Sequence, residues 1–386
     1  MRICRIVDWF PSGEQIKGDL APNYYYLSKY TVDEGYDVHI VCGRKAGEKK
    51  YEEIDGIKIH RVAKINNRRS YLYGDFAKES FKKIKEIKPD IIHGHTTIHF
   101  ACVWNKEKIG NTMVLTHFHS ALDSYKHIDY LPIFFNIKEA LAYRFAMWSY
   151  FHENKLVLKK SNYIIAVSRT SAKSIKSYIP EARISVIYNG FDPKLFRRVE
   201  SDIKERLNAD YLLLYVGRPM PGKGIQYLLR AIPELNKRFN GLKVLLLGVE
   251  REDSKIFCEW LRSIAKKLEL NNVVFSKGVP QKEMPKYYSA ADCFVLPTLS
   301  EGLSKVLLEA QACSCPVVAT NIGSNREIVS KKGGLLCKPR SVEDLREKIT
   351  FVLENKRKFD GRKSVGRFTW NRCAEKIIDL YRNLVS

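Results

Sequence analysis

The sequence lacks the features that mark membrane-spanning or disulfide-stapled proteins. It contains no run of about eighteen consecutive apolar residues, so no segment is expected to cross a bilayer as a helix. Its first residues have neither the apolar core nor the small-residue cleavage site of a secretory signal. The nine cysteines include no Cys-x-x-Cys pair, and several, such as Cys4, Cys42 and Cys293, lie in apolar runs. We therefore expect buried thiols in a reducing compartment and a cytoplasmic location.

Acidic residues are scarce relative to basic ones. The 43 Asp and Glu residues are outnumbered by 66 Lys and Arg residues, and the formal net charge is +23. The positive excess is spread over both halves of the chain, so it does not form a basic tail. A phosphate-bearing small molecule, a nucleic acid and an acidic membrane face are all compatible with this charge.

The length of 386 residues, with 45% hydrophobic and 28% charged residues, predicts two or three soluble domains. Short β-rich runs alternate with helix-length segments, a pattern typical of α/β domains with doubly wound parallel sheets. The runs expected as strands are 3–7, 38–42, 58–62, 90–93, 113–116, 163–167 and 184–187, then 212–216, 244–247, 273–275, 293–296, 317–319 and 335–337.

A turn-rich stretch from Asn189 to Arg198 separates the two series of strands. We predict an N-terminal Rossmann-like domain at 1–190, a second Rossmann-like domain at 191–368, and a C-terminal helix at 369–386 that packs on either domain. Ligands of doubly wound sheets bind beyond the carboxyl ends of the strands. The loops at these ends are therefore the first candidates for a site.

One such loop, 215–224, follows an expected strand and precedes a helix expected from about Ile225. Gly217, Gly222 and Lys223 match the first part of a phosphate-binding P-loop, but Gly224 stands where that motif needs a Ser or Thr for Mg²⁺. Arg218 and Lys223 still offer a planar fork and a point charge for phosphate oxygens, beside a helix N-terminus. The loop is predicted to bind a diphosphate, with solvated turn residues as the alternative.

A second loop follows the expected strand 293–296. Glu301 lies in this loop, and Glu309 lies eight residues later on a helix expected from about Ser304. Carboxylates accept hydrogen bonds from sugar hydroxyls, whereas helix N–H groups and cations hold phosphates. This combination suits a nucleotide-sugar. In the structural alternative, Glu301 caps the helix and Glu309 forms a salt bridge along it.

Taken together, these motifs resemble glycosyltransferase family 4, whose members are retaining enzymes of the GT-B fold. The segment 300–320 resembles the family's E-x7-E block, and 217–231 resembles its diphosphate loop. Further similarities, in the family's order, are Asn189-Gly190-Phe191-Asp192, Ala166-Val167-Ser168, His95 after Ile92, and the segment 114–119. The resemblance covers nearly the whole chain and implies two Rossmann-like domains facing across a cleft.

The resemblance implies a hexosyltransferase that moves a hexosyl unit from a nucleoside-diphosphate sugar to a hydroxyl acceptor with retention of configuration. Arg218 and Lys223 would bind the diphosphate, and Glu309 the ribose hydroxyls. Glu301 would hold the transferred sugar. The backbone of Gly302, Leu303 and Ser304 would contact the β-phosphate or sugar, and that of Gly278 and Val279 the nucleobase.

His119 matches the family histidine near the anomeric centre. His117 is the neighbour that could be confused with it, because strand alternation sends both side chains to the same side. His93 and His95 are interpreted as structural. Catalytic roles are thus expected for His119 and Glu301.

No metal or other cofactor is expected. The sequence contains no Asp-x-Asp pair to hold a metal clamp, and Arg218, Lys223 and the backbone N–H groups at 302–304 can stabilise the leaving diphosphate.

The chain departs from the family pattern on the acceptor side. The glycine-rich turn after the first strand is replaced by 9–19, with Gly13 and Gly18 as candidates, and Ser324-Asn325 interrupts a common double glycine. The segment 125–160 combines aromatic and basic residues. This combination suits either a packed core or peripheral contact with an anionic membrane, at the inner membrane face, where a lipid-linked acceptor would lie.

Two other functions are compatible with these features. A GT-B relative could epimerise or hydrolyse a nucleotide-sugar, and acceptor-dependent release of nucleoside diphosphate would distinguish transfer from both. The net charge and the basic run 356–363 would also suit a nucleic-acid-binding protein, but the charge is dispersed and no recognition module is present, so no nucleic-acid partner is expected.

Overall fold

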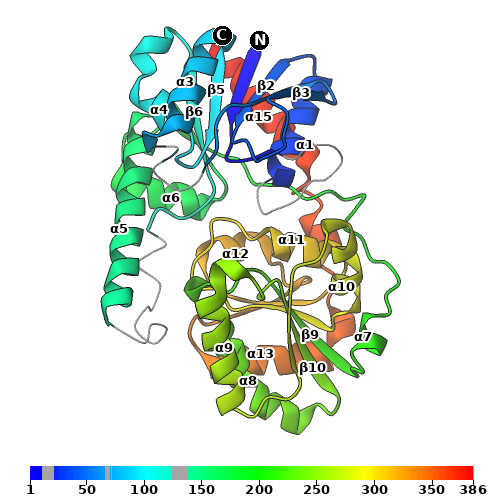
Figure 1. The fold of residues 1–386 in the computed structure, drawn as a ribbon. Helices are drawn as coiled ribbons and strands as arrows, with labels where there is room; N and C mark the ends of the chain where they lie inside the picture. Colours follow the sequence, from blue (N-terminus) through cyan, green and yellow to red (C-terminus); the bar gives the residue numbers. More distant parts are fainter. Residues whose placement is uncertain (11–20, 66–69, 71, 124–136, 386) are drawn as a thin grey trace. The chain divides into compact units, whose positions relative to one another are not determined.

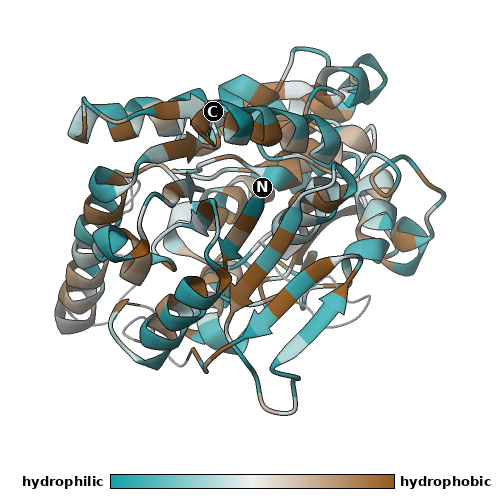
Figure 2. Ribbon diagram, turned by 90° about the horizontal axis from the view of Figure 1, so that it is seen from above, coloured by the Kyte–Doolittle hydropathy of each residue, from teal (hydrophilic) through white to brown (hydrophobic). Residues whose placement is uncertain are grey.

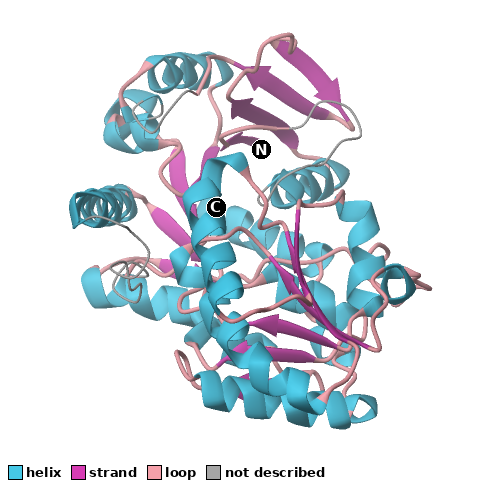
Figure 3. Cartoon of the chain, turned by 60° about the horizontal axis from the view of Figure 1, so that its bottom comes forward, coloured by secondary structure: helices cyan, strands magenta, loops and turns pink. Residues whose placement is uncertain are grey.

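The computed structural model describes residues 1–10, 21–65, 70, 72–123 and 137–385. The chain forms two compact α/β units, which are described separately (Figure 1). The first contains Met1–Leu122, Trp148–Gly190 and Trp370–Ser386; the second contains Asp123–Met147 and Phe191–Thr369. Both units carry a mainly parallel sheet accompanied by helices (Figure 3). The predicted doubly wound α/β class is confirmed.

The sheet of the first unit has eight strands in the order β3-β4-β2-β1-β5-β6-β7-β8. All neighbours are parallel except β3 and β4. The strands are β1 (Arg2–Ile6), β2 (Asp37–Cys42), β3 (Tyr51–Ile54), β4 (Ile57–Arg61), β5 (Ile91–His95), β6 (Met113–Phe118), β7 (Tyr163–Ala166) and β8 (Ile184–Val186). The helices are α1 (Ala21–Asp33), α3 (Asp75–Ile87), α4 (Phe100–Trp104), α5 (Ile137–Lys160), α6 (Arg169–Tyr178) and α15 (Trp370–Val385), with α5 beginning in the stretch assigned to the second unit.

The second unit has six parallel strands in the order β11-β10-β9-β12-β13-β14. They are β9 (Tyr211–Val216), β10 (Leu242–Leu247), β11 (Val273–Ser276), β12 (Cys293–Leu296), β13 (Val317–Thr320) and β14 (Gly334–Cys337). The helices are α7 (Ile203–Arg206), α8 (Ile225–Arg238), α9 (Lys255–Lys267), α10 (Met284–Ala290), α11 (Lys305–Ala312), α12 (Gly323–Ile328), α13 (Val342–Glu354) and α14 (Arg362–Val365).

The strands are apolar along most of their length. Helices cover both faces of a parallel sheet, so neither face offers polar residues a side in contact with water. The central residues of β9 and β10, from Leu213 to Leu214 and from Val244 to Leu247, are almost fully buried. In Figure 2 the inner strands carry brown, hydrophobic bands, whereas the outermost strands are largely teal. No helix in the described part of the chain is long and apolar enough to span a bilayer.

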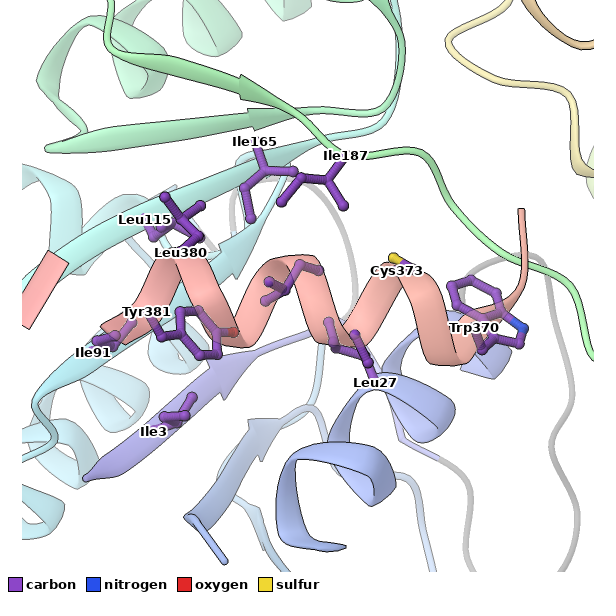
Figure 4. Close-up of a cluster of buried hydrophobic side chains, with 12 residues drawn as sticks. Ile3, Leu27, Ile91, Leu115, Ile165, Ile187, Trp370, Cys373, Leu380 and Tyr381 are labelled. Atoms are coloured by element: carbon purple, nitrogen blue, oxygen red, sulfur yellow. The ribbon is translucent and has the colours of Figure 1, made fainter. Parts of the chain in front are cut away.

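Helix α15 packs on the first unit although it follows the second in sequence. Trp370, Ala374, Ile377 and Tyr381 on its buried face join a cluster with strand residues such as Ile91 (Figure 4). The expected helix at the C-terminus is confirmed, and its apolar face contacts strands β1, β5, β6 and β7.

Candidate active site

The order of strands in the second unit places two loops side by side. β10 and β11 lie on one side of β9, and β12 lies on the other side and pairs directly with β9. The carboxyl ends of β9 and β12 therefore flank the topological switch point, where doubly wound sheets bind ligands. The loops that follow these strands are 217–224 and 297–304, the two that the sequence singled out.

Backbone contacts hold the two loops together. The Leu299 N–H donates to the Gly222 carbonyl at 2.7 Å, and the Thr298 hydroxyl donates to the same oxygen at 2.9 Å. Gly224 has φ +67°, and a Cβ at this position would lie 2.0 Å from the Pro297 carbonyl oxygen. Only glycine fits this close approach, which explains why the loop does not carry the hydroxyl residue of a P-loop.

An ion pair joins the loops at their tips. Lys223 Nζ lies 2.5 Å from Glu301 Oε1, and the two side chains are 28% and 13% exposed. The tyrosine at the end of β9, Tyr215, is fully buried, and its pKa lies well above its usual value because of burial and then the nearby Glu301 carboxylate. Lys223 and Glu301 were predicted to act on different parts of one ligand, and the structure brings them into direct contact.

Arg218 lies in the same loop and is exposed. The Tyr215 hydroxyl donates to the carbonyl oxygen of Arg218 at 3.3 Å, and the positive charge of Arg218 limits the rise in the pKa of Tyr215. The pKa of Asp253 is lowered to about 2, mainly by a hydrogen bond from Arg251, and the charge of Arg218 adds to this effect. Arg218 therefore adds positive charge to the same loops as Lys223.

Helix α11 begins directly behind Glu301. Ser304 is its N-cap residue, so the expected start of the helix is confirmed. Gly302, Leu303 and Ser304 are all buried. The first N–H groups of a helix have no partner within it and carry partial positive charge. From the adjoining helix α12, the Ser324 hydroxyl donates to the Glu301 carbonyl oxygen at 3.3 Å.

Glu309 is the fifth residue of α11. The buried Tyr288 hydroxyl donates to its Oε2 at 2.9 Å. Burial, then the Glu309 carboxylate, holds the pKa of Tyr288 well above its usual value, so the hydroxyl stays a donor. A tyrosine on α10 therefore orients the Glu309 carboxylate, a contact that neither interpretation of the sequence anticipated.

Gly278 and Val279 follow β11, two strands away from β9 on the same edge of the sheet. Gly278 is exposed, and a Cβ built on it meets no atom within 4 Å. The segment is connected to the loop after β10, because the N–H groups of Gly248 and Val249 donate to the Ser276 carbonyl oxygen.

In the first unit, four histidines form a stacked array at the carboxyl ends of β5 and β6. The rings of His117 and His119 lie 4.4 Å apart, so both do point to one side, as predicted. His117 is 2% exposed, whereas His119 is half-buried. His119 Nε2 lies 2.8 Å from His95 Nδ1, and its Nδ1 lies 3.4 Å from the Asn189 amide nitrogen. Burial thus distinguishes His119 as the more accessible of the pair.

The other members of the array are deeply buried. Burial lowers the pKa values of His93, His95 and His117 well below the usual value, and the charge of Arg5 lowers them further. His93 Nδ1 bonds the Tyr381 hydroxyl of α15. Within the described residues, the ring nitrogens of His93, His95 and His117 lie within 4.8 Å of one another. Their rings are stacked, with 8° between His93 and His95, so the lone pairs do not converge, and we assign no metal ligand to them.

Several contacting residues were missed by the sequence analysis. Thr298, Tyr288 and Ser324 position the candidate loops, but hydroxyl residues carry no motif of their own. The sequence marked Ser324 only as a departure from the double glycine that is common in the family. Of the acceptor-side candidates, Gly13 and Gly18 lie outside the described residues, as do residues 125–136 of the aromatic and basic segment.

Comparisons with known proteins agree with this arrangement. The family model described as Glycosyltransferase Family 4 matches residues 24–195, and the one described as Glycosyl transferases group 1 matches residues 197–369. An uncharacterized glycosyltransferase of Methanocaldococcus jannaschii is 26% identical over 413 residues, covering 99% of this chain and 98% of that protein.

Solved structures share the fold across the whole chain. Sucrose-phosphate synthase from Thermosynechococcus elongatus superposes with a TM-score of 0.82 at 20% identity, covering 99% of this chain and 98% of its own. Anabaena HepE in complex with UDP-glucose gives 0.73 at 18% identity, covering 99% and 100%. Two consecutive family matches, a relative along the full length and a shared two-unit architecture lead to one conclusion: the chain belongs to glycosyltransferase family 4 and is a hexosyltransferase of the GT-B fold.

Proposed function

We propose that the chain transfers a hexosyl unit from a nucleoside-diphosphate sugar to a hydroxyl acceptor, with retention of anomeric configuration and without a metal ion. The observation that carries the proposal is the pairing of Lys223 with Glu301 at the switch point between β9 and β12. It places an ammonium for phosphate and a carboxylate for sugar hydroxyls within one ligand's reach. Anabaena HepE, a structural neighbour, was solved with UDP-glucose.

In the free protein, Lys223 and Glu301 neutralise each other. Both side chains retain some exposure, so a ligand can separate them. The diphosphate then binds the ammonium of Lys223 and the guanidinium of Arg218. The carboxylate of Glu301 no longer pairs with Lys223 and accepts hydrogen bonds from the transferred sugar. Glu309, oriented by Tyr288, holds the ribose hydroxyls at the other end. Gly278 and Val279 contact the base through their main chain.

Negative charge develops on the diphosphate as the sugar departs. Arg218, Lys223 and the N–H groups of Gly302, Leu303 and Ser304 supply preorganised positive charge for it. The acceptor hydroxyl attacks from the face that the diphosphate leaves, and its proton passes to the leaving phosphate oxygen. Within the first unit, His95 and Asn189 hold His119 in orientation, and His119 is the histidine proposed to act at the anomeric carbon. No step requires a metal, so chelation with EDTA leaves turnover unchanged.

Donor binding is tested by thermal unfolding in the presence of a panel of nucleotide-sugars. A donor at 100 times its Kd stabilises the protein by about 2.7 kcal/mol. Lys223→Ala and Glu301→Gln each reduce this stabilisation, whereas Lys332→Ala, which removes an exposed lysine from the turn before β14, leaves it intact. Equal stabilisation in all three variants would refute the proposed donor site.

The reaction class is tested with the donor identified in that panel. Transfer requires an acceptor for release of nucleoside diphosphate, whereas a hydrolase releases it in water and an epimerase converts the donor without release. The anomeric configuration of the product, read from its proton NMR coupling constants, tests retention. An inverted product would exclude same-face attack.

We also propose that helix α5 contacts the cytoplasmic face of an anionic membrane, where a lipid-linked acceptor would be reached. Leu141, Phe145 and Trp148 are 59%, 67% and 49% exposed and recur at helical spacing, so they share one face. Exposed apolar residues beside cations such as Arg144 suit contact with the headgroup layer of an anionic membrane. Co-sedimentation with vesicles containing phosphatidylglycerol should fall in a Phe145→Ser, Trp148→Ser variant, and equal sedimentation would refute the contact.

A further inference from the structure

A polar cavity lies in the second unit, at the opposite edge of its sheet from the candidate donor loops. It has a volume of about 950 Å³. Three segments line it: 198–204 around the start of α7, residues 289–292 and 314–316 at the amino ends of β12 and β13, and 356–362 between α13 and α14. The donor loops follow the carboxyl ends of β9 and β12, and the six residues of β9 span about 20 Å. The two places are therefore distinct.

The floor of this cavity is built around Asp292. This carboxylate is 6% exposed and accepts from the Leu212 N–H at 2.9 Å. Two lysines share it: Lys204 Nζ lies 2.8 Å from Oδ2, and Lys356 Nζ lies 2.6 Å from Oδ1. One negative charge thus fixes two ammonium groups in place and leaves one positive charge uncompensated at the floor.

The rim adds further cations. Arg198, Arg357 and Arg362 line the cavity, together with the acids Glu200 and Asp360. Arg362 lies 3.7 Å from Asp360. Within the described residues, Arg198 and Arg357 have no carboxylate partner at ion-pair distance. The five cations and three carboxylates that line the cavity leave an excess of two positive charges.

A hydroxyl group is also available. Ser314 follows α11 in a left-handed conformation with φ +58°, and its buried Oγ has no hydrogen-bond partner among the residues that the structure describes. A buried hydroxyl without a partner costs free energy, and a ligand oxygen in the cavity would recover it.

We propose that this cavity binds a ligand that carries a phosphomonoester. A phosphomonoester carries nearly two negative charges at neutral pH, which matches the excess of the lining. Guanidinium forks bind phosphate oxygens bidentately, so Arg198 and Arg357 are the specific contacts, and Lys204, Lys356 and Ser314 complete the cradle. The same chemistry occurs in soluble phosphate esters and in the headgroup of phosphatidic acid. The basic run 356–363, which the transfer reaction does not use, thereby acquires a role.

The test compares two double variants with equal loss of charge. Arg198→Ala, Arg357→Ala removes the two specific contacts, whereas Lys358→Ala, Lys363→Ala removes exposed cations of the same segment that do not line the cavity. Binding of glycerol phosphate is measured by calorimetry. We expect the arginine variant to bind at least about tenfold more weakly, and the lysine variant to bind within about twofold of the unchanged protein.

The donor loops are themselves proposed to bind phosphate, so Lys223→Ala is measured beside these variants. Retained binding in Lys223→Ala with loss in the arginine variant supports the cavity. The reverse pattern assigns the phosphate to the donor loops and overturns the proposal. The nucleotide-sugar response of the arginine variant should stay unchanged, so failure of this proposal is separable from failure of the donor site.

The source of the phosphate is distinguished with vesicles of phosphatidylcholine alone, with phosphatidic acid, and with phosphatidylglycerol. Binding that requires phosphatidic acid and falls only in the arginine variant identifies a lipid headgroup. Calorimetric binding without that vesicle effect identifies a soluble ester. An equal loss of binding in both double variants would indicate general electrostatic attraction and would overturn the proposal. The proposal is also overturned if neither glycerol phosphate nor any of the vesicles binds the unchanged protein.

Discussion

Gly224 is the residue at which the candidate site depends most directly on backbone geometry. A Cβ there would lie 2.0 Å from the Pro297 carbonyl oxygen, at φ +67°. We predict that Gly224→Ala destabilises the protein by about 2–4 kcal/mol, through overpacking and a strained backbone, and weakens the response to nucleotide-sugars because the two loops separate. Urea unfolding and the thermal-shift panel measure both effects.

Gly35, which follows helix α1, provides the control for this substitution. Its φ is also positive, at +83°, but a Cβ there meets no atom of the described residues within 4 Å. Gly35→Ala should therefore cost only the backbone strain, about 1 kcal/mol, and leave the nucleotide-sugar response intact. Equal losses in the two variants would mean that the loop contact contributes nothing.

The positions of the two candidate loops were predictable, because they follow the carboxyl ends of β9 and β12, but most of the contacts that support their charged residues were not. The roles of Lys223, Glu301 and Glu309 in binding a ligand stay predictions. Tyr288, which orients Glu309, lies 21 residues away on another helix, and only the packing of α10 on α11 brings it close. Strand alternation did not distinguish His117 from His119, because it fixes the side of a residue but not its depth, and only the family resemblance favoured His119.

Among the strands, β-rich runs predicted every member of both sheets except β3. That strand, Tyr51–Ile54, is half-exposed at the edge and carries two glutamates, so it has no apolar run to reveal it. Its signal was the dipeptide Asp55-Gly56, where both residues have positive φ. This is the pattern of a two-residue hairpin turn, and it explains why β3 is the antiparallel strand of its sheet.

Helix α15 follows the second unit in sequence, but it belongs to the core of the first. Ile377 is fully buried within that cluster, and Figure 4 shows the helix lying along strand residues of the first unit. We predict that Ile377→Ala lowers stability by about 2–5 kcal/mol, because it removes buried methyl groups and leaves a cavity. Val385→Ala on the same helix, which truncates a 45% exposed side chain, should change stability little.

Hydrogen exchange would locate the effect of Ile377→Ala. Amides of β1, β5 and β6 should exchange faster in this variant, whereas those of β9 and β12 in the second unit should keep their rates. Faster exchange confined to the second unit would contradict the assignment of α15 to the first.

For the chain as a whole, the histidine array predicts how stability depends on pH. His93, His95 and His117 have folded-state pKa values well below the ordinary value, and burial lowers that of His99 to about 3. The unfolded chain takes up protons on these side chains as the pH falls through about 6.5, and the folded chain does not. Their contribution to stability is therefore complete above about pH 6.5 and is lost as the solution becomes more acidic.

Each of these histidines should remove about 1.4 kcal/mol of stability per pH unit below 6.5. Within the described residues, the ring nitrogens of His117 have no hydrogen-bond partner, so His117→Phe keeps a flat buried ring and removes one titrating group. Urea midpoints at pH 7.5, 6.5 and 5.5 should show an acid-side slope shallower by about one proton, with little loss of stability at pH 7.5. A slope that His117→Phe does not alter would mean that His117 exchanges its proton in the folded chain as readily as in the unfolded one.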